Sequence, residues 1–473
     1  MGVGVLGMEP QAKRLLVIGG GAAGMSAAAA ARRRQPEAEI VVIERGPRVS
    51  FMLCGLPYFI SDVVKDEESL VVYEAGYFRT ERQIDVRTGC EVKGIDAQAH
   101  TVECIDVATR EKEVLGYKKL VIAAGAQPIL PGIRGLELGG VFALRTLDSA
   151  IAVKQFITRR PVKRAAIIGA GYIGLEMAEA LTTAGALTTM IEASDTVLPM
   201  SEPEIGELIE EELRGHGVEL LKRRLALSFE GASGTVDRVA TDGGDVAAEM
   251  VLIAAGARPD SAVAREAGVA LGEIGGIATD EMMRTNVADI YAAGDCVESR
   301  NVLTGKAIFL PLGTTANKQG RVAGDNAMGG RATFPGIMTT LAFKVFDLEV
   351  ARTGLSHDQA RSAGFTPVSA VIRFPSRSPF YPRAETLTVK LIADERSGRL
   401  LGAQMAGHGT VAKRIDVVAA ALHAKMTVAD LLQLDLTHAP PFANEWEGIQ
   451  LAAQAIAHHR VRSASAPSTR PVR

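Results

Sequence analysis

The feature that most constrains the fold is a strand, glycine turn and helix pattern that occurs twice. An apolar run at 14–18 leads into a glycine-rich turn at 19–24, and a similar run at 165–168 leads into a turn at 169–174. Both turns read G-x-G-x-x-G: the first glycine makes a tight turn, the second lets a pyrophosphate approach, and the third lets the helix pack closely. The helix N-terminus that follows offers unpaired N–H groups to phosphates. The chain therefore predicts two α/β dinucleotide-binding domains.

Acidic residues and tail phrases support both sites. A second strand, predicted at 39–43 and again at 188–191, ends in Glu44 or Glu192, where a carboxylate can accept hydrogen bonds from a ribose. Each half then closes with a similar phrase, at 120–128 and at 251–259. These repeated features make an ordinary glycine-rich turn a poor explanation of either motif.

Glu192 bears on the choice of nucleotide in the second site. A 2′-phosphate carries about −1.5 to −2 charges, and a carboxylate about 4 Å away repels it by roughly 4 kcal/mol per unit charge at an effective dielectric of 20. The residues at 193–195 include no arginine to offset this. The sequence predicts that NADH is preferred over NADPH.

The pattern changes after Pro335. Strands of an antiparallel sheet are predicted at 343–351, 368–374, 387–393 and 400–405, and helices at 412–424 and 445–457. This arrangement indicates a separate C-terminal α+β domain. The small, polar tail that follows is predicted to be disordered.

Composition excludes several classes of partner. A net charge of −3 and a pI near 6.3 leave no basic footprint for nucleic acid or an anionic membrane. No apolar run approaches the roughly 20 residues that span a bilayer. The segment at 1–9 lacks the features of a secretion signal, and four scattered cysteines suit a reducing compartment. We expect a cytoplasmic protein whose partners are small molecules and itself.

Cys54 is the candidate reactive group. It lies in the run 50–58, far along the chain from the next cysteine, Cys90. It therefore has no CxxC partner, and as a redox group it would pass through a mixed disulfide, a persulfide or a sulfenic acid. Leu56 and Pro57 are predicted to start a helix whose dipole favours the thiolate. The alternative is a buried structural cysteine, which is the role we expect for Cys90, Cys104 and Cys296.

Together these motifs resemble the FAD-dependent pyridine nucleotide-disulfide oxidoreductases, from about Arg14 to about His459. The run 50–58 and the phrases at 312–321 and 344–354 are similar to the single-cysteine branch, which contains coenzyme A-disulfide reductases, coenzyme A-persulfide reductases and NADH oxidases. The resemblance implies an FAD domain in two parts, 13–150 and 276–334, an NAD(P)H domain at 151–275 and a dimerisation domain at 335–461. The predicted disordered tail is 462–473. It also implies a homodimer whose C-terminal domain lends residues to the partner's active site.

The resemblance assigns residues to the two cofactors. Asp295 would face a ribityl hydroxyl, Tyr172 would screen the flavin until nicotinamide enters, and Glu176 would lie near the flavin edge. The expected cofactor-binding residues are Gly19, Gly21, Ala22, Ala23, Gly24, Glu44, Arg45, Ala124, Gly125, Gly169, Gly171, Tyr172, Ile173, Gly174, Glu176, Glu192, Gly256, Gly294, Asp295, Thr314 and Thr315. No metal is expected.

The implied reaction passes electrons from NADH through FAD to Cys54, which reduces a low-molecular-weight disulfide or persulfide, most simply one of coenzyme A. Coenzyme A-disulfide reductases resemble the chain but carry asparagine where Leu53 stands, arginine near Ala30 and tyrosine near Phe442. Tyr381 keeps its hydroxyl, and His438 is a candidate acid for the leaving thiolate or else an ordinary loop histidine. The arginines at 32–34 either contact substrate phosphates or form a solvated helix end.

Other reactions stay open. The main alternative is an NADH oxidase or peroxidase that cycles through a Cys54 sulfenic acid, although such peroxidases carry histidine where Ala22 stands. A second alternative is an electron-transfer reductase or a flavoprotein that binds partners according to its redox state, and neither needs Cys54.

Overall fold

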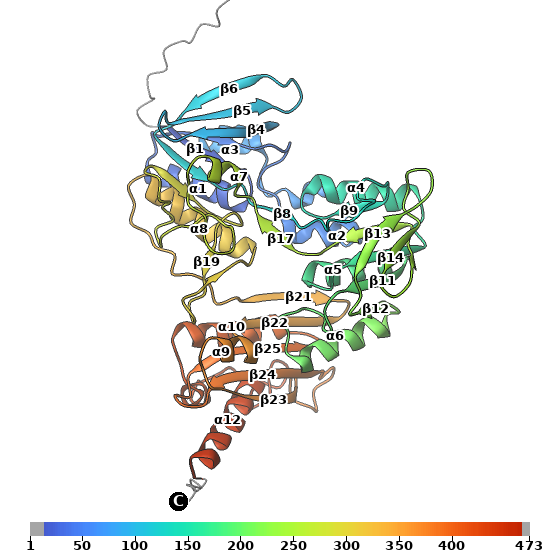
Figure 1. Cartoon of the computed structure of the whole chain (residues 1–473). Coiled ribbons are helices and arrows are strands. Elements are labelled where there is room, and N and C mark those ends of the chain that lie inside the picture. Colours follow the sequence, from blue (N-terminus) through green and yellow to red (C-terminus); the bar gives the residue numbers. More distant parts are fainter. Residues whose placement is uncertain (1–13, 466–473) are drawn as a thin grey trace, which may run out of the picture. The chain divides into compact units, whose positions relative to one another are not determined.

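The computed structural model describes residues 14–465, which form two compact units. The first unit contains the chain up to Pro131 and the segments Ala143–Arg160 and Ala255–Ile337. The second contains Gly132–Phe142, Pro161–Ala254 and the chain from Met338. Residues 255–275, predicted with the NAD(P)H domain, belong to the first unit. The reason is that the strand at 257–259 pairs with the strand at 126–128 of that unit. Figure 1 labels many elements of both units.

A parallel five-stranded sheet forms the centre of the first unit. Its strands, in spatial order, are β18 (Ile290–Ala292), β7 (Lys119–Ile122), β1 (Arg14–Ile18), β2 (Glu39–Ile43) and β3 (Asp85–Arg87). The apolar residues of β1 and β2 are buried, as expected for a parallel sheet covered on both faces. Both strands match the predicted bounds, whereas the first helix, α1 (Ala22–Arg34), begins inside the glycine turn.

Glycines allow two helices to pack closely in the first unit. α8 (Gly313–Ala327) lies against α1 (Figure 1). A Cβ atom added at Gly320 would lie 2.1 Å from the Ala23 carbonyl oxygen, and one at Gly324 would lie 2.0 Å from that of Ala27. Within the phrase at 312–321, Gly320 is therefore needed for α8 to pack against α1.

The remaining elements of the first unit surround this core. They are the antiparallel strands β4 (Cys90–Asp96), β5 (Thr101–Asp106) and β6 (Lys112–Gly116), the ribbons β8 (Ala126–Pro128) with β17 (Ala257–Pro259) and β19 (Ser299–Arg300) with β20 (Ala307–Ile308), the helices α2 (Leu56–Ile60), α3 (Ala75–Arg82), α4 (Leu147–Arg159) and α7 (Ala262–Glu266), and the 3₁₀ turns η1 (Leu53–Gly55) and η2 (Glu67–Leu70).

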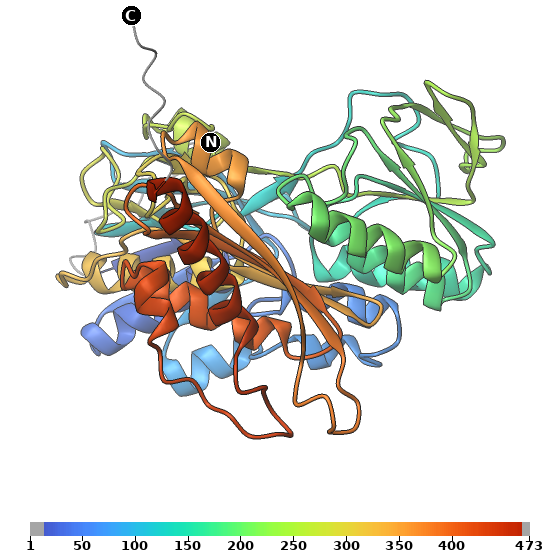
Figure 2. The ribbon, with the colours of Figure 1, turned by 90° about the horizontal axis from the view of Figure 1, so that it is seen from below.

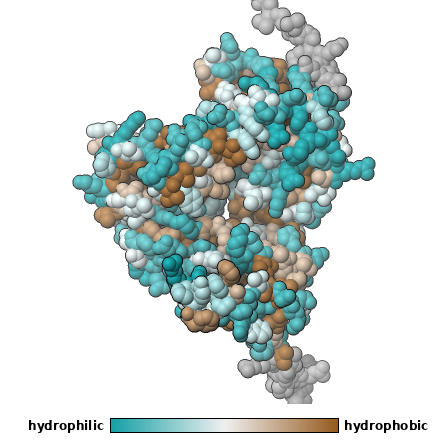
Figure 3. All heavy atoms as spheres, turned by 180° about the vertical axis from the view of Figure 1, so that it is seen from behind, coloured by the Kyte–Doolittle hydropathy of each residue, from teal (hydrophilic) through white to brown (hydrophobic). Residues whose placement is uncertain are grey.

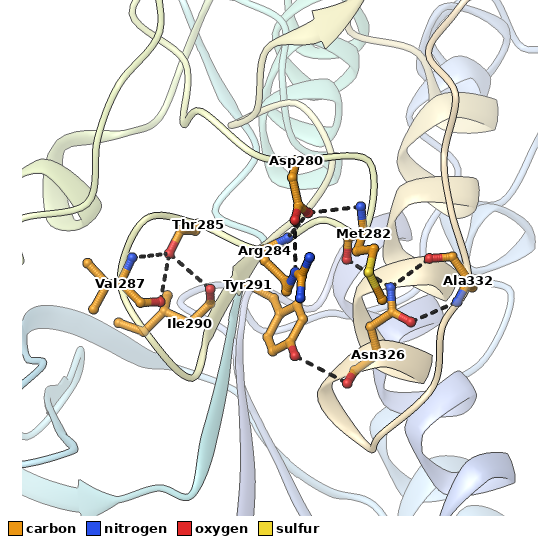
Figure 4. Close-up of polar contacts among 9 residues, drawn as sticks. All are labelled: Asp280, Met282, Arg284, Thr285, Val287, Ile290, Tyr291, Asn326 and Ala332. Carbon is orange, nitrogen blue, oxygen red and sulfur yellow. Dashed lines mark hydrogen bonds and ion pairs between the residues drawn. The ribbon is translucent and has the colours of Figure 1, made fainter.

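Polar contacts fix the segment before β18 (Figure 4). Asp280 accepts hydrogen bonds from the backbone N–H and the Nε of Arg284 at 3.0 and 2.8 Å. The Tyr291 hydroxyl donates to the Asn326 carbonyl at 3.2 Å, and Asn326 Nδ2 donates to the Met282 and Ala332 carbonyls. β18 is thereby tied to the end of α8, which positions the Gly294-Asp295 turn.

The second unit contains another sheet of the same kind. In spatial order its strands are β12 (Glu219–Lys222), β11 (Leu187–Glu192), β10 (Arg164–Ile168), β16 (Met250–Ile253) and β9 (Val141–Ala143). α5 (Tyr172–Thr183) follows the second glycine turn, α6 (Pro203–Gly215) follows β11, and an antiparallel ribbon contains β13 (Ala226–Glu230), β14 (Arg238–Thr241) and β15 (Val246–Ala247). The two parallel sheets confirm the predicted α/β class.

The C-terminal part of the second unit is an antiparallel sheet with helices. Its strands, in spatial order, are β21 (Leu341–Val345), β22 (Leu348–Gly354), β25 (Leu400–Gly407), β24 (Thr386–Asp394) and β23 (Pro367–Pro375), and its helices are α9 (His357–Ser362), α10 (Val411–His423), α11 (Val428–Leu432) and α12 (Gly448–Ser465). α10 packs against β22 and β25, and α12 against β23 and β24. These helices, drawn in red in Figure 2, cross the orange strands.

Three predictions for this part were wrong in detail. The predicted strand 343–351 is a hairpin, because Phe346 has a φ of 50° and turns the chain between β21 and β22. The predicted helix 445–457 begins later, at Gly448, and continues to Ser465. Residues 462–465, predicted as disordered, are therefore helical, while 466–473 and 1–13 lie outside the described residues.

The surface drawn in Figure 3 carries hydrophilic residues over much of its area, with hydrophobic groups among them. Between residues 14 and 465, no helix is both long enough and apolar enough to cross a membrane.

Candidate active site

The first glycine turn has three glycines with three different roles. Gly19 has a φ of 100°, and a Cβ there would lie 2.2 Å from the Ala123 carbonyl oxygen at the end of β7. A Cβ at Gly24 would lie 1.8 Å from the Gly19 carbonyl oxygen, whereas one at Gly21 would meet nothing within 4 Å. Gly19 and Gly24 are thus needed for the protein's own packing, and Gly21 faces open space.

The second turn repeats this geometry. Gly169 has a φ of 104°, a Cβ at Gly174 would lie 2.2 Å from the Gly169 carbonyl oxygen, and one at Gly171 would meet nothing within 4 Å. Gly21 and Gly171 are also the N-caps of α1 and α5, where no side chain caps the helix. First-turn N–H groups can therefore donate to a phosphate in that open space. Both turns fit the pyrophosphate of a dinucleotide.

The two acidic residues hold the turns together. Glu44 accepts hydrogen bonds from Gly20 N at 2.7 Å and from Gly46 N at 2.6 Å. Glu192 accepts from Ala170 N at 2.6 Å and from Ser194 N and Oγ at 2.8 and 2.7 Å. A carboxylate has about four acceptor positions, so each retains capacity for a ribose hydroxyl. Each acid thus joins its glycine turn to the next loop.

Two residues outside the expected set of site residues hold the Gly294-Asp295 turn. Arg145 Nη2 donates to Asp295 Oδ2 at 2.7 Å, and Arg145 Nε donates to the Ala126 carbonyl at 3.0 Å. Gln319, almost fully buried, accepts from Gly294 N at 2.8 Å. Gln319 lies inside the phrase at 312–321, so that resemblance pointed to it, but no sequence signal marked Arg145.

The two similar tail phrases pair with each other. β8 and β17 form an antiparallel ribbon in the first unit, with Ala257 opposite Pro128. Gly125 and Gly256 precede the two strands with φ of 79° and 103°. Asp260 N donates to the Gly125 carbonyl at 3.0 Å, and Ile129 N donates to that of Gly256 at 2.9 Å. The repeat therefore builds one ribbon, and both predicted glycines turn the chain into it.

Several predicted cofactor residues occupy first turns of helices. Ala22 and Ala23 begin α1, Tyr172 and Ile173 begin α5, and Thr314 and Thr315 begin α8. Glu176 lies one turn further along α5, Arg45 follows Glu44, and Ala124 precedes Gly125.

Cys54 is exposed and lies in the 3₁₀ turn η1, directly before α2. The predicted helix start at Leu56 is confirmed, with Pro57 in the first turn. Cys104 and Cys296 are fully buried, and Cys296 Sγ donates to the carbonyls of Ala293 and Ile122 at 3.3 and 3.5 Å. The four thiols therefore differ sharply in access.

Thiol labelling is expected to follow this difference. Burial raises the pKa of Cys296 to about 12, and burial with a hydrogen bond to Cys90 raises the pKa of Cys104 to about 12. Both stay protonated at neutral pH, and only thiolates are alkylated. Brief iodoacetamide treatment of native protein should label Cys54 before Cys104 or Cys296, as measured by peptide mass spectrometry. Equal labelling of the three would contradict this assignment.

The other predicted catalytic residues lie in loops of the second unit. Tyr381 lies between β23 and β24, and His438 between α11 and α12, and both are exposed. Ser378 N donates to the Pro440 carbonyl at 3.2 Å, which joins the two loops. The structure thus brings the Tyr381 and His438 loops together.

A largely buried ion pair anchors these loops. Arg414 Nε donates to Glu447 Oε1 at 2.6 Å, and Arg414 Nη2 donates to the carbonyls of Ser376 and Phe442 at 2.7 and 3.2 Å. Sequence reasoning missed Arg414 because its partners are distant in the chain. Phe442 itself is 71% exposed, so its ring is available to a partner or ligand.

The arginines at the end of α1 hold the first unit together. Arg32 donates to the carbonyls of Arg82 at 3.0 Å and of Gln83 and Pro36, and Arg34 pairs with Asp325 at 3.1 Å. These contacts favour the structural interpretation of the run at 32–34 over contact with substrate phosphates. Ala30 is buried and has no polar side chain to offer.

A double dinucleotide fold with an exposed cysteine defines a flavin- and nicotinamide-dependent oxidoreductase. The family model "Pyridine nucleotide-disulphide oxidoreductase" matches residues 13–320, and the dimerisation domain of the same family matches 340–448. The chain belongs to this family. It is therefore an FAD-dependent NAD(P)H oxidoreductase, and its dimerisation domain supports the predicted homodimer.

Relatives show where in the family the chain falls. It is 38% identical to the "NAD(P)H sulfur oxidoreductase (CoA-dependent)" of Pyrococcus abyssi, over 89% of this chain and 93% of that protein. It is 33% identical to an "NADH oxidase" of Methanocaldococcus jannaschii, over 88% of this chain and 93% of that protein. A solved NAD-dependent persulfide reductase from A. fulgidus has a TM-score of 0.92 and 39% identity, covering 95% of this chain and 84% of that one.

Proposed function

We propose that this protein is an NADH-dependent reductase of coenzyme A persulfide or coenzyme A disulfide that acts through Cys54. The observation that carries the proposal is an exposed cysteine before a proline-started helix, with Cys104 and Cys296 buried elsewhere. The names of the relatives from P. abyssi and A. fulgidus support a sulfur substrate and CoA. The site residues and cytoplasmic location predicted from the sequence are part of this proposal.

Cys54 would act as the nucleophile. Its thiolate attacks the outer sulfur of a persulfide R–S–SH, the S–S bond breaks, and R–S⁻ leaves while Cys54 carries the outer sulfur as Cys–S–SH. Reduction of this S–S bond to the Cys54 thiolate and HS⁻ needs two electrons, which FAD held at the first glycine turn would supply after receiving a hydride from NADH. With a disulfide R–S–S–R the intermediate is a mixed disulfide, and two thiols are released.

Other residues of the chain bind, orient and protonate. The turns at Gly21 and Gly171 would hold the pyrophosphates of FAD and NADH, and Glu44 and Glu192 would bind ribose hydroxyls. Glu192 would also repel a 2′-phosphate, which favours NADH. Tyr381 and His438 of the partner subunit would donate a proton to the leaving thiolate.

The test is anaerobic NADH oxidation by purified protein with CoA persulfide, CoA disulfide and a panel of other small disulfides. Turnover of a CoA substrate at least about tenfold above that of the panel is expected if the CoA handle adds binding energy. NADH oxidation that requires oxygen and is not stimulated by any sulfur compound would instead support an NADH oxidase, the alternative suggested by the name of the M. jannaschii relative.

A further inference from the structure

The loop after Glu192 has a neighbour that the local sequence does not reveal. β11 and β12 are parallel, and their hydrogen bonding continues past the strand ends. Arg223 N donates to the Ser194 carbonyl at 2.9 Å, and Arg224 N donates to that of Glu192 at 3.0 Å. Two arginines therefore lie beside the segment 193–195, which itself contains no arginine.

These charged residues differ in how they are held. The Glu192 side chain is buried and accepts hydrogen bonds from Ala170 and Ser194. The Arg224 guanidinium lies against Gly243, so that a Cβ added there would overlap it. Arg223 is 77% exposed, and its Nη2 lies 3.2 Å from Oδ2 of Asp195, itself 61% exposed. Arg223 and Asp195 are thus a solvent-facing pair beside a fixed carboxylate.

This segment lies where the adenosine ribose is expected to bind, and NADH and NADPH differ only by the 2′-phosphate on that ribose. In dinucleotide-binding folds the acidic residue after the second strand receives the adenosine ribose, and an arginine nearby can accommodate a 2′-phosphate. The guanidinium fork suits phosphate, but here a carboxylate occupies it. An exposed ion pair contributes only about 0–1 kcal/mol to stability, so replacing Asp195 should leave the fold intact.

We infer that Asp195 sets the nucleotide preference by occupying Arg223. With the pair intact, Asp195 neutralises Arg223, and the buried Glu192 carboxylate is the charge left beside the ribose, so NADH is favoured. Without the Asp195 charge, Arg223 binds the 2′-phosphate and NADPH becomes a good donor. The inference deepens the NADH preference of the proposed function, and it is independent of the sulfur substrate.

The experiment compares two probes that differ only in the 2′-phosphate. Isothermal titration calorimetry would measure Kd of the FAD-loaded dimer for 2′,5′-ADP and for 5′-AMP in four proteins: wild type, Asp195→Asn, Arg223→Gln and the double variant. Asp195→Asn should tighten 2′,5′-ADP about tenfold, because one anion no longer competes for the guanidinium. The Kd for 5′-AMP should change less than about twofold, since the ribose acid Glu192 is untouched.

Two further proteins test whether the gain comes from Arg223: the double variant, and a control variant that loses a negative charge elsewhere. In the double variant the gain for 2′,5′-ADP should disappear, because the gain requires Arg223. Asp416→Asn removes the same charge from an exposed pair with Lys413 on α10 and should change neither Kd. A gain that persists without Arg223, an equal gain for 5′-AMP, or no gain in Asp195→Asn would each overturn the inference. Because neither probe needs a thiol, these outcomes are separate from failure of persulfide reduction.

Discussion

Replacing Cys54 with serine is expected to lower persulfide- or disulfide-dependent NADH oxidation by about a thousandfold or more, because the proposed nucleophile is the thiolate and a hydroxyl stays protonated at neutral pH. The serine variant should still bind FAD, since Cys54 is outside both glycine turns. Anaerobic mixing with NADH should therefore bleach the flavin at the wild-type rate, and a sulfur substrate should no longer restore the colour. Stopped-flow absorbance measures the two halves of the reaction separately.

The matched control is Cys90→Ser. Cys90 is half-buried at the start of β4 in the same unit, where the proposed chemistry does not use it. We expect it to keep turnover within about twofold of wild type, in line with the small effect of most changes away from a site. Full thiol-dependent activity in Cys54→Ser would instead favour the electron-transfer reductase.

Local patterns were enough to predict the two dinucleotide folds. The run of Gly19, Gly21 and Gly24 defines turn, open space and close packing within six residues, and the flanking apolar strands are themselves continuous in sequence. The bounds of the strand at 39–43 were predicted correctly for the same reason: its run of buried apolar residues ends directly before the charged residue Glu44. A local signal thus sufficed where the whole pattern lies within a few consecutive residues.

Contacts between distant segments could not be predicted. Arg145 and Asp295 are 150 residues apart in the chain and follow strands of different sheets, so no local pattern joins them. Arg223 reaches Asp195 because β12 and β11 are parallel and end at the same edge of one sheet. For Arg223 a topological clue existed: the two strands of a strand, helix, strand unit are parallel, so the residues that follow the two strands become neighbours. The hairpin within 343–351 failed differently, because Phe346 adopts a positive φ that its residue type disfavours.

Substituting Gly24 with alanine is expected to prevent FAD binding and to destabilise the first unit. The new Cβ would lie 1.8 Å from the Gly19 carbonyl oxygen. Because this oxygen belongs to the backbone, it cannot move away as a flexible side chain could. Such overpacking costs about 2 to 3 kcal/mol, so the purified protein should be colourless, with a melting temperature below that of wild-type apoprotein. Flavin absorbance and thermal denaturation measure the two effects, and a yellow protein of normal stability would contradict the geometry.

Gly21→Ala separates ligand contact from packing. A Cβ there meets nothing within 4 Å, so the apoprotein should melt at the wild-type temperature, yet the methyl group would occupy the space assigned to the pyrophosphate. Because bound ligand stabilises a fold by mass action, saturating FAD should raise the melting temperature of wild type and of Gly76→Ala, whose Cβ also meets nothing, but raise that of Gly21→Ala much less. If FAD raised the melting temperature equally in all three proteins, the pyrophosphate could not bind at this turn. The protein's own packing requires Gly24, and we expect that only the bound nucleotide requires Gly21.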